Sequence, residues 1–219
     1  MSINIRIIAL TLFMILNFVV LGQSIIFRGG ISISNISSIS KSKDYLENTK
    51  PYYAVNMSAL SNMKITDNVI LETGLHLCTR GIKQEVEQMS GIRTVISKNK
   101  LLLAYLNIPL NLKITHNFNK TKIYSSFGPY IGSGLIGNKK IQLDSNDLNL
   151  PYAKRVIWGN DENTDDLRRL DYGLSIGVGI EFNSIQLGIA YYQGISNISS
   201  NRDLKLFNRA FEVFVGGKI

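Results

Sequence analysis

The chain has 219 residues, of which 45% are hydrophobic, and 24 Lys and Arg stand against 16 Asp and Glu. This length suits one barrel-sized domain and excludes two large ones. A bundle of membrane-spanning helices is excluded too, because each span needs about 20 consecutive apolar residues and only the first segment approaches that length. The basic residues are interspersed with acids instead of forming a stripe with aromatic residues, which argues against nucleic acid as a partner.

The N-terminal segment has the order of a secretory signal. Arg6 supplies the positive charge, an apolar stretch follows from Ile7 to Leu21, and the small residue Gly22 ends it. We therefore expect a signal peptide over residues 1–22 and an exported domain over residues 23–219. A retained membrane anchor is the alternative, because a single positive charge precedes the apolar stretch. Cys78 is the only cysteine, so an intrachain disulfide is excluded.

Apolar and polar residues alternate with a period of two along the exported domain, which predicts strands. In the clearest case the residues from Tyr172 to Phe182 place six apolar side chains on one face and small or polar ones on the other. Eight segments follow this pattern, although the fifth alternates less cleanly: Ile25–Ser34, Pro51–Asn62, Val69–Arg80, Leu102–Ile114, Lys122–Gly137, Asp171–Phe182, Ile185–Gly194 and Leu206–Lys218.

The connections between these segments alternate between long and short. The sequence predicts long loops at Lys41–Lys50, Lys83–Lys98, Lys139–Arg169 and Ser196–Lys205, and short turns at Lys64–Asn68, Thr115–Thr121 and Asn183–Ser184. Short turns at one end and long loops at the other are typical of even-stranded outer-membrane barrels. The fold class expected is therefore all-β, an eight-stranded antiparallel up-and-down transmembrane β-barrel.

The polar face of the strands indicates which side faces inward. A soluble lipocalin-like carrier, the alternative, has its apolar face inside and a solvent-exposed outer face. Here the polar face consists mostly of Gly, Ser and Asn, which suits a narrow interior. Tyr172 and Phe182 lie ten residues apart on the apolar face. At about 3.3 Å per residue and a tilt of about 40°, they span roughly 25 Å, the height of an apolar band between aromatic girdles.

Several short motifs resemble the PorT-like outer-membrane β-barrel family. They are Ile108-Pro109-Leu110, the run from Phe127 to Gly132, Asp171-Tyr172-Gly173-Leu174, and the closing strand from Phe207. The resemblance covers essentially the whole exported domain and implies an eight-stranded barrel. For the founding type it also implies a part in protein secretion across the outer membrane. The chain departs from the family in ending on Ile219 instead of an aromatic residue.

Charged residues on the inward face form one constellation, which we expect to be a lumen network of ion pairs, because buried charges must be paired. A proton or substrate path is the alternative, for which the single histidine among them is weak support. The network expected is Arg28, Glu72, His76, Arg80, Lys113, Glu181, Glu212 and Lys218.

No catalytic, cofactor-binding or metal site is expected. His76 has Gly74 and Cys78 as its neighbours on the same strand face, and a small inward filler accounts for Cys78 better than a nucleophile does. Asp161, Asn163 and Asp165 match the first ligand positions of a calcium loop, but the match then fails at the turn glycine and at the last carboxylate.

These patterns predict a non-enzymatic outer-membrane barrel of a Gram-negative bacterium, and the resemblance implies that it acts as an envelope or secretion accessory through its loops or partners. The partners expected are outer-membrane lipid, the barrel-assembly machinery and secretion-machinery proteins, with no nucleic acid and no cofactor. The alternatives are a lipid-modifying enzyme of the outer membrane and the soluble carrier.

Overall fold

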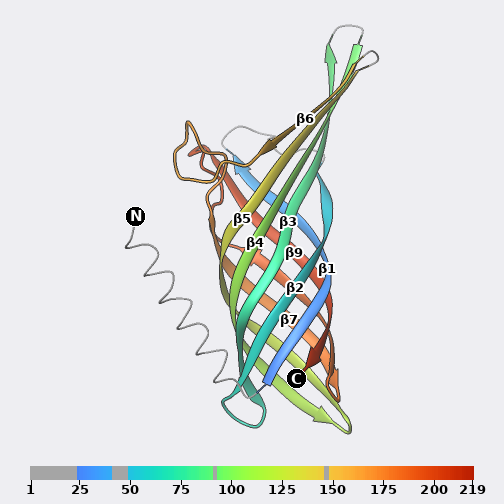
Figure 1. Cartoon of the computed structure of the whole chain (residues 1–219), viewed down its shortest axis with the longest axis vertical. Helices are drawn as coiled ribbons and strands as arrows, with labels where there is room; N and C mark the ends of the chain where they lie inside the picture. Colours follow the sequence, from blue (N-terminus) through green and yellow to red (C-terminus); the bar gives the residue numbers. More distant parts are fainter. Residues whose placement is uncertain (1–23, 41–48, 91–92, 146–147) are drawn as a thin grey trace.

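The computed structural model describes residues 24–40, 49–90, 93–145 and 148–219 (Figure 1). The signal peptide expected over residues 1–22 lies outside the described residues. Within them, no helix has the length and apolar character needed to cross a membrane.

Eight of the nine described strands close into a ring. Its order is β4-β3-β2-β1-β9-β8-β7-β5, and β5 pairs back with β4, always antiparallel. The eight-stranded up-and-down barrel is thereby confirmed. The strands are β1 (Ser24–Ser40), β2 (Thr49–Lys64), β3 (Val69–Ser90), β4 (Arg93–Phe118), β5 (Thr121–Ser145), β6 (Leu148–Arg155), β7 (Leu170–Phe182), β8 (Ile185–Gly194) and β9 (Leu204–Lys218).

Short turns join the strands at one end of the barrel, which we call the short-turn end. Two residues separate β4 from β5 and two separate β7 from β8, and the first residue of each turn, Asn119 or Asn183, has a φ of 54°. Asparagine enters this left-handed region more readily than most other residues, because its short side chain bonds locally. The three predicted short connections are confirmed, and the one after β4 is tighter than expected.

The apolar face points outward, as predicted. The six apolar residues of β7 from Tyr172 to Phe182 are between 44% and 60% exposed, whereas Asp171 and Ser175 on the other face are buried. Aromatic side chains are exposed near both edges of this apolar band, with Phe27 toward the short-turn end and Tyr53 toward the other. An exposed apolar wall contradicts the soluble carrier, in which this face would be inside.

The fifth predicted strand alternates less cleanly because it contains a bulge. The β4–β5 register shifts between Ala104 and Tyr105, so that Leu135 is inserted between Gly134 and Ile136. Leu135 and Ile136 are consecutive and both exposed, which strict alternation forbids. Beyond the bulge the alternation is shifted by one residue, so that Gly137 points inward.

The prediction of two of the long loops is wrong, because much of their length is paired strand. Lys83–Lys98 forms the continuation of β3 and β4, which stay paired as far as Ser90 and Arg93. The first half of Lys139–Arg169 forms the end of β5 together with β6, which among the described strands pairs only with β5. Figure 1 shows these strands rising beyond the barrel as a narrow sheet, which we call the projection. Charge-rich sequence indicated exposure here, but exposure does not prevent backbone pairing.

Candidate functional site: the filled lumen and its mouth

The lumen near the short-turn end holds the first of three polar clusters. Arg28 of β1 donates from Nη1 to Glu72 Oε1 of β3 at 3.0 Å, pairs through Nη2 with the other oxygen, and donates from Nε to Gln186 of β8. Lys113 of β4 forms an ion pair with Glu181 of β7, which also accepts a bond from Gln186 Nε2 at 2.9 Å. Five strands are therefore tied together across the interior.

Aromatic rings complete this first cluster. The guanidinium of Arg28 lies 4.8 Å from the ring centre of Phe214, and the ammonium of Lys113 lies 4.2 Å from that of Tyr124. Cations within about 6 Å of a ring face are attracted by its quadrupole. Both cations are thus held by a carboxylate and a ring at once.

The second cluster lies farther up the lumen and centres on Glu212 of β9. Arg80 Nη1 donates to Glu212 Oε1 at 2.8 Å, and His76 Nε2 lies 3.3 Å from Oε2. Tyr192 of β8 packs against both partners, with ring-centre distances of 5.2 Å to the His76 ring and to the Arg80 guanidinium carbon. Because Arg80 and His76 both belong to β3, their contacts with the Glu212 carboxylate join β3 to β9 across the lumen.

The third cluster is anchored by Asp171 at the start of β7. Its carboxylate accepts hydrogen bonds from Ser196 Oγ at 2.8 Å and from Asn208 Nδ2 at 2.9 Å. On the neighbouring strands β3 and β4, Asn107 Nδ2 donates a hydrogen bond to Cys78 Sγ at 3.3 Å. Cys78 is thus a buried, hydrogen-bonded filler on the inward face.

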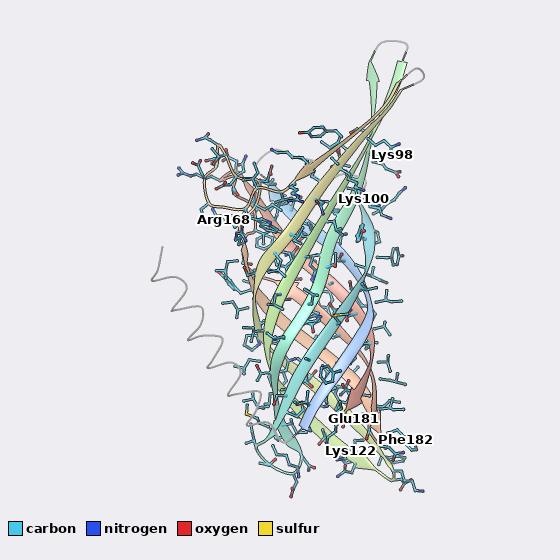
Figure 2. All side chains as sticks on the ribbon, in the orientation of Figure 1. Lys98, Lys100, Lys122, Arg168, Glu181 and Phe182 are labelled. Atoms are coloured by element: carbon cyan, nitrogen blue, oxygen red, sulfur yellow. The ribbon has the colours of Figure 1, made fainter. Side chains whose placement is uncertain are left out.

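Seven of the eight predicted network residues lie within these first two clusters. Lys218 does not join them, because it is exposed at the end of β9, where it pairs with Ile26 at the barrel rim. The sequence pattern did not single out Gln186, Tyr192 or Asp171, although their parity on β7 and β8 places them inward. Figure 2 labels Glu181 near the short-turn end, close to Phe182 and Lys122.

Little free space remains between the first two clusters. A cavity lined by Arg28, His76, Tyr192, Glu212 and neighbouring residues has a volume of only about 10 Å³. A single water needs about 10–15 Å³ by this measure. This part of the lumen therefore offers no room for a permeating solute.

At the other end lies an apolar cluster, which we call the mouth core, and six of its ten members also line a pocket of about 460 Å³. Wall residues such as Leu103 and Leu206 pack there with three residues from the connecting segments, Val156, Leu167 and Ile198. The segments are tied down by backbone bonds, including Arg168 N to Ile198 O at 2.8 Å and Ile198 N to Leu206 O at 3.0 Å. Its members are Ile36, Cys78, Ile82, Leu103, Tyr105, Val156, Leu167, Ile198, Leu204 and Leu206.

The mouth core was not predicted. The residual signal in the sequence is that Leu204 and Leu206 share the inward parity of Glu212, so the inward face of β9 turns apolar toward the mouth. Trp158 packs edge-on against Tyr105, with ring centres 5.9 Å apart, and extends the core outward.

Carboxylates above the mouth core are engaged by backbone groups. Asp165 Oδ2 accepts from Asp161 N at 2.8 Å, and Asp161 Oδ1 accepts from Asn163 N at 2.9 Å. These three residues, which partly match a calcium loop, therefore cap their own turn. Within the described residues no group of three or more His, Cys, Asp or Glu is arranged to hold a metal ion.

A search of curated proteins found no match. Among solved structures the chain is similar to three outer-membrane barrels. The attachment invasion locus protein Ail of Yersinia pestis, in complex with the heparin analogue sucrose octasulfate, is 11% identical, with coverage of 90% of this chain and 98% of that one and a TM-score of 0.34. OprG of Pseudomonas aeruginosa is 11% identical, with coverage of 90% and 96% and a TM-score of 0.44. Neisserial surface protein A is 9% identical, with coverage of 89% and 97% and a TM-score of 0.36.

A family model settles the classification. The model described as outer membrane protein beta-barrel domain matches residues 22–200, which span most of the described barrel. This match, together with the closed ring and its apolar outer wall, shows that the chain belongs to the outer membrane protein beta-barrel domain family and is a protein of the Gram-negative outer membrane.

Proposed function

We propose that this protein is a closed barrel that anchors the projection outside the cell, where it binds an envelope or secretion-machinery protein. The observation that carries the proposal is the continuation of β3, β4 and β5 beyond the apolar band as a paired sheet, with β6 added at its edge. Long connections of outer-membrane barrels lie on the extracellular side. The packed lumen leaves this outer surface as the part that is free to act.

The edge of the projection favours recognition through side chains. An open edge strand can accept a strand from another chain, but Pro, Lys and Arg discourage such pairing. β6 carries Pro151, Lys154 and Arg155, while Tyr152 between them is 58% exposed. An exposed tyrosine is a typical contact residue of protein interfaces. Tyr152 is therefore the position at which we expect the partner to be closest.

Site-specific photocrosslinking in intact cells tests this function. Replacing Tyr152 with the photoreactive benzoylphenylalanine keeps an aromatic ring at the site. Phe118, which is 64% exposed at the short-turn end, provides the matched control. The proposal expects a protein adduct that forms at residue 152 and not at 118. Equal adducts at the two positions, or none at 152, would overturn it.

The adduct also tests the role in secretion, which rests on the resemblance to PorT-like barrels. A secretion accessory predicts that the captured protein is a component of an export apparatus. It also predicts that a deletion strain loses exported proteins from the medium. Unchanged export in that strain would leave only the general envelope role.

The alternative of a lipid-modifying enzyme gains no support from the two residues considered for it. His76 and Cys78 are both buried on the inward face, so neither meets the lipid around the barrel. The carboxylate that contacts His76 is also held by Arg80. Mass spectrometry of outer-membrane lipids from the deletion strain tests this alternative, which predicts a missing lipid modification.

During biogenesis we expect the barrel-assembly machinery to engage the last strand. Ile219 takes the outward parity of Val213 and Val215 and is 84% exposed. It can therefore extend the apolar outward face of β9 that this machinery would contact. If so, Ile219→Phe assembles at least as well as the wild type, and Ile219→Asp assembles less well, as measured by the heat-modifiable folded fraction.

A further inference from the structure

Four lysines stand in register across four neighbouring strands at the base of the projection. Lys50 of β2 pairs with Lys83 of β3, Lys83 with Lys100 of β4, and Lys100 with Lys140 of β5. We call these residues the lysine row. Directly opposite side chains in a sheet have Cβ atoms about 4.5–5.5 Å apart, and like charges in such positions are destabilising.

The groups that face the lysine row offset only part of this repulsion. The ammonium groups of Lys83 and Lys100 both lie 5.6 Å from the ring centre of Tyr52. Lys50 forms an ion pair with Glu85 at 2.7 Å, with both side chains well exposed. Hydrogen bonding to Lys50 holds the pKa of the Glu85 carboxyl below its usual range, and nearby Lys98 and Lys83 act in the same direction.

The charge around the row is strongly one-sided. On the outward face of these strands, the described side chains of residues 49–55, 81–85, 97–102, 137–142 and 152–155 include six basic residues and one acidic residue, Glu85. The basic residues are Lys50, Lys83, Lys98, Lys100, Lys140 and Arg155. This surface therefore attracts anions.

The height of the lysine row indicates which anions are within reach. On β4, Lys100 is the next outward position beyond the apolar residue Leu102, so the two are separated by roughly 7 Å along the strand. Exposed Tyr53 marks the aromatic edge on β2, three residues from Lys50. Figure 2 shows Lys98 and Lys100 on the projection, at the end of the molecule away from Lys122. The row thus lies at the level where lipid headgroups begin.

We propose that the lysine row binds the phosphate groups of a phosphorylated glycolipid in the outer leaflet, so that the base of the projection is held on the membrane surface. Basic clusters beside the hydrocarbon region attract anionic headgroups with a gain equivalent to about fivefold in affinity per Lys. Bound phosphates would also relieve the repulsion between the paired lysines. This role is separate from that of Tyr152, which lies on β6.

The test compares two lipid compositions and three variants of the full-length barrel. The protein is refolded into phosphatidylcholine vesicles containing either bisphosphorylated lipid A or the same glycolipid without phosphates. Retention of the glycolipid is measured by native mass spectrometry, and the urea midpoint of unfolding is measured in the same vesicles. The variants are Lys83→Gln/Lys100→Gln, the charge-conserving Lys83→Arg/Lys100→Arg, and Lys122→Gln at the short-turn end.

The proposal predicts roughly thirtyfold weaker retention of bisphosphorylated lipid A for the double Gln variant, since two lysines are lost. The Arg variant and Lys122→Gln should retain it as the wild type does. The double Gln variant should also have a lower urea midpoint with the phosphorylated lipid, and an equal or higher midpoint without phosphates, because repulsion is relieved. A purely structural role of the two lysines would lower both midpoints.

Two outcomes would overturn the proposal. One is equal retention of the phosphorylated and dephosphorylated glycolipid by the wild type. The other is displacement of the lipid by inositol hexakisphosphate at equal phosphate concentration, which would make the lysine row a site for a soluble polyanion.

Discussion

The two ends of the lumen are filled in different ways. Toward the short turns the filling, within the described residues, consists of side chains from the strands of the wall, and each of the cations Arg28, Arg80 and Lys113 contacts a glutamate. At the mouth the filling is apolar, and Val156, Leu167 and Ile198 arrive from connecting segments. The charged part is consequently locked to the barrel wall, whereas the apolar part depends on segments that can leave without opening a strand pair.

This difference predicts different consequences of damage. Removing one member of a buried ion pair leaves an uncompensated charge and costs about 3–5 kcal/mol. Truncating a buried aliphatic side chain costs about 2–5 kcal/mol, and less where the site can collapse. Damage to the charged part should therefore weaken the whole barrel, and damage to the mouth core should first release the loops.

The largest effect is expected for Glu72→Gln. This substitution keeps the shape and removes the charge that faces Arg28, and we expect it to lower the free energy of unfolding by about 3–5 kcal/mol. Urea titration of the barrel in vesicles measures the change. The double variant Arg28→Met/Glu72→Leu should recover most of the loss, since an apolar pair of similar volume leaves no charge unpaired. No recovery would show that Glu72 acts through something other than this pair.

Ile198→Ala tests the apolar end of the lumen. Ile198 is fully buried and comes from the β8–β9 connection. We expect the lost packing, about 2–5 kcal/mol, to fall mainly on docking of the connecting segments. Trypsin should then cut at Arg168 or Arg169 faster than in the wild type, while the urea midpoint moves less than for Glu72→Gln. Equal shifts of the two midpoints would mean that the mouth core and the wall unfold together.

The next largest effect is expected for a charge placed on the lipid-facing side of the barrel wall. Val178 is 48% exposed within the apolar band, and Val178→Arg should cost about 2–4 kcal/mol in a bilayer. Ile39→Arg is the matched control, because Ile39 is 62% exposed above the band, where the cost falls to about 0–1 kcal/mol. The neighbouring residue Gly179 faces the lumen and would be the nearest comparison, but any side chain there is strained, since a Cβ would lie 2.3 Å from Leu187 O and 2.4 Å from Tyr124 Oη. Equal folding yields of the two Arg variants in liposomes would contradict the assignment of faces.

The smallest effect is expected for Glu85→Gln on the projection. The pKa of Glu85 is lowered chiefly by its hydrogen bond to Lys50, so the stabilisation from this pair is present at neutral pH and is lost as the pH falls through that lowered pKa. The variant should have nearly the wild-type urea midpoint at pH 7, since both side chains are exposed and solvent screens the pair. The remaining difference should disappear in acid. A difference in urea midpoint between the variant and the wild type that grows in acid would contradict the lowered pKa of Glu85.

The barrel was predictable because its cause is local. Each strand carries the period of two that separates Val178 outside from Ser175 inside, and buried charges follow the same parity. The projection was missed because Lys139 and its neighbours suggested a solvated loop, although Ile141 and Leu143 keep the alternation of a strand. The part of the mouth core that comes from the connecting segments has no local pattern, since Val156, Leu167 and Ile198 meet only after the barrel has closed.

Planar-bilayer recording of the purified full-length barrel tests the sealed lumen most directly. The ion-paired clusters and the mouth core together predict a protein that inserts without stable conductance steps. Large, steady, porin-like steps from the wild-type protein would contradict the filled lumen, and with it the conclusion that the projection is the acting surface.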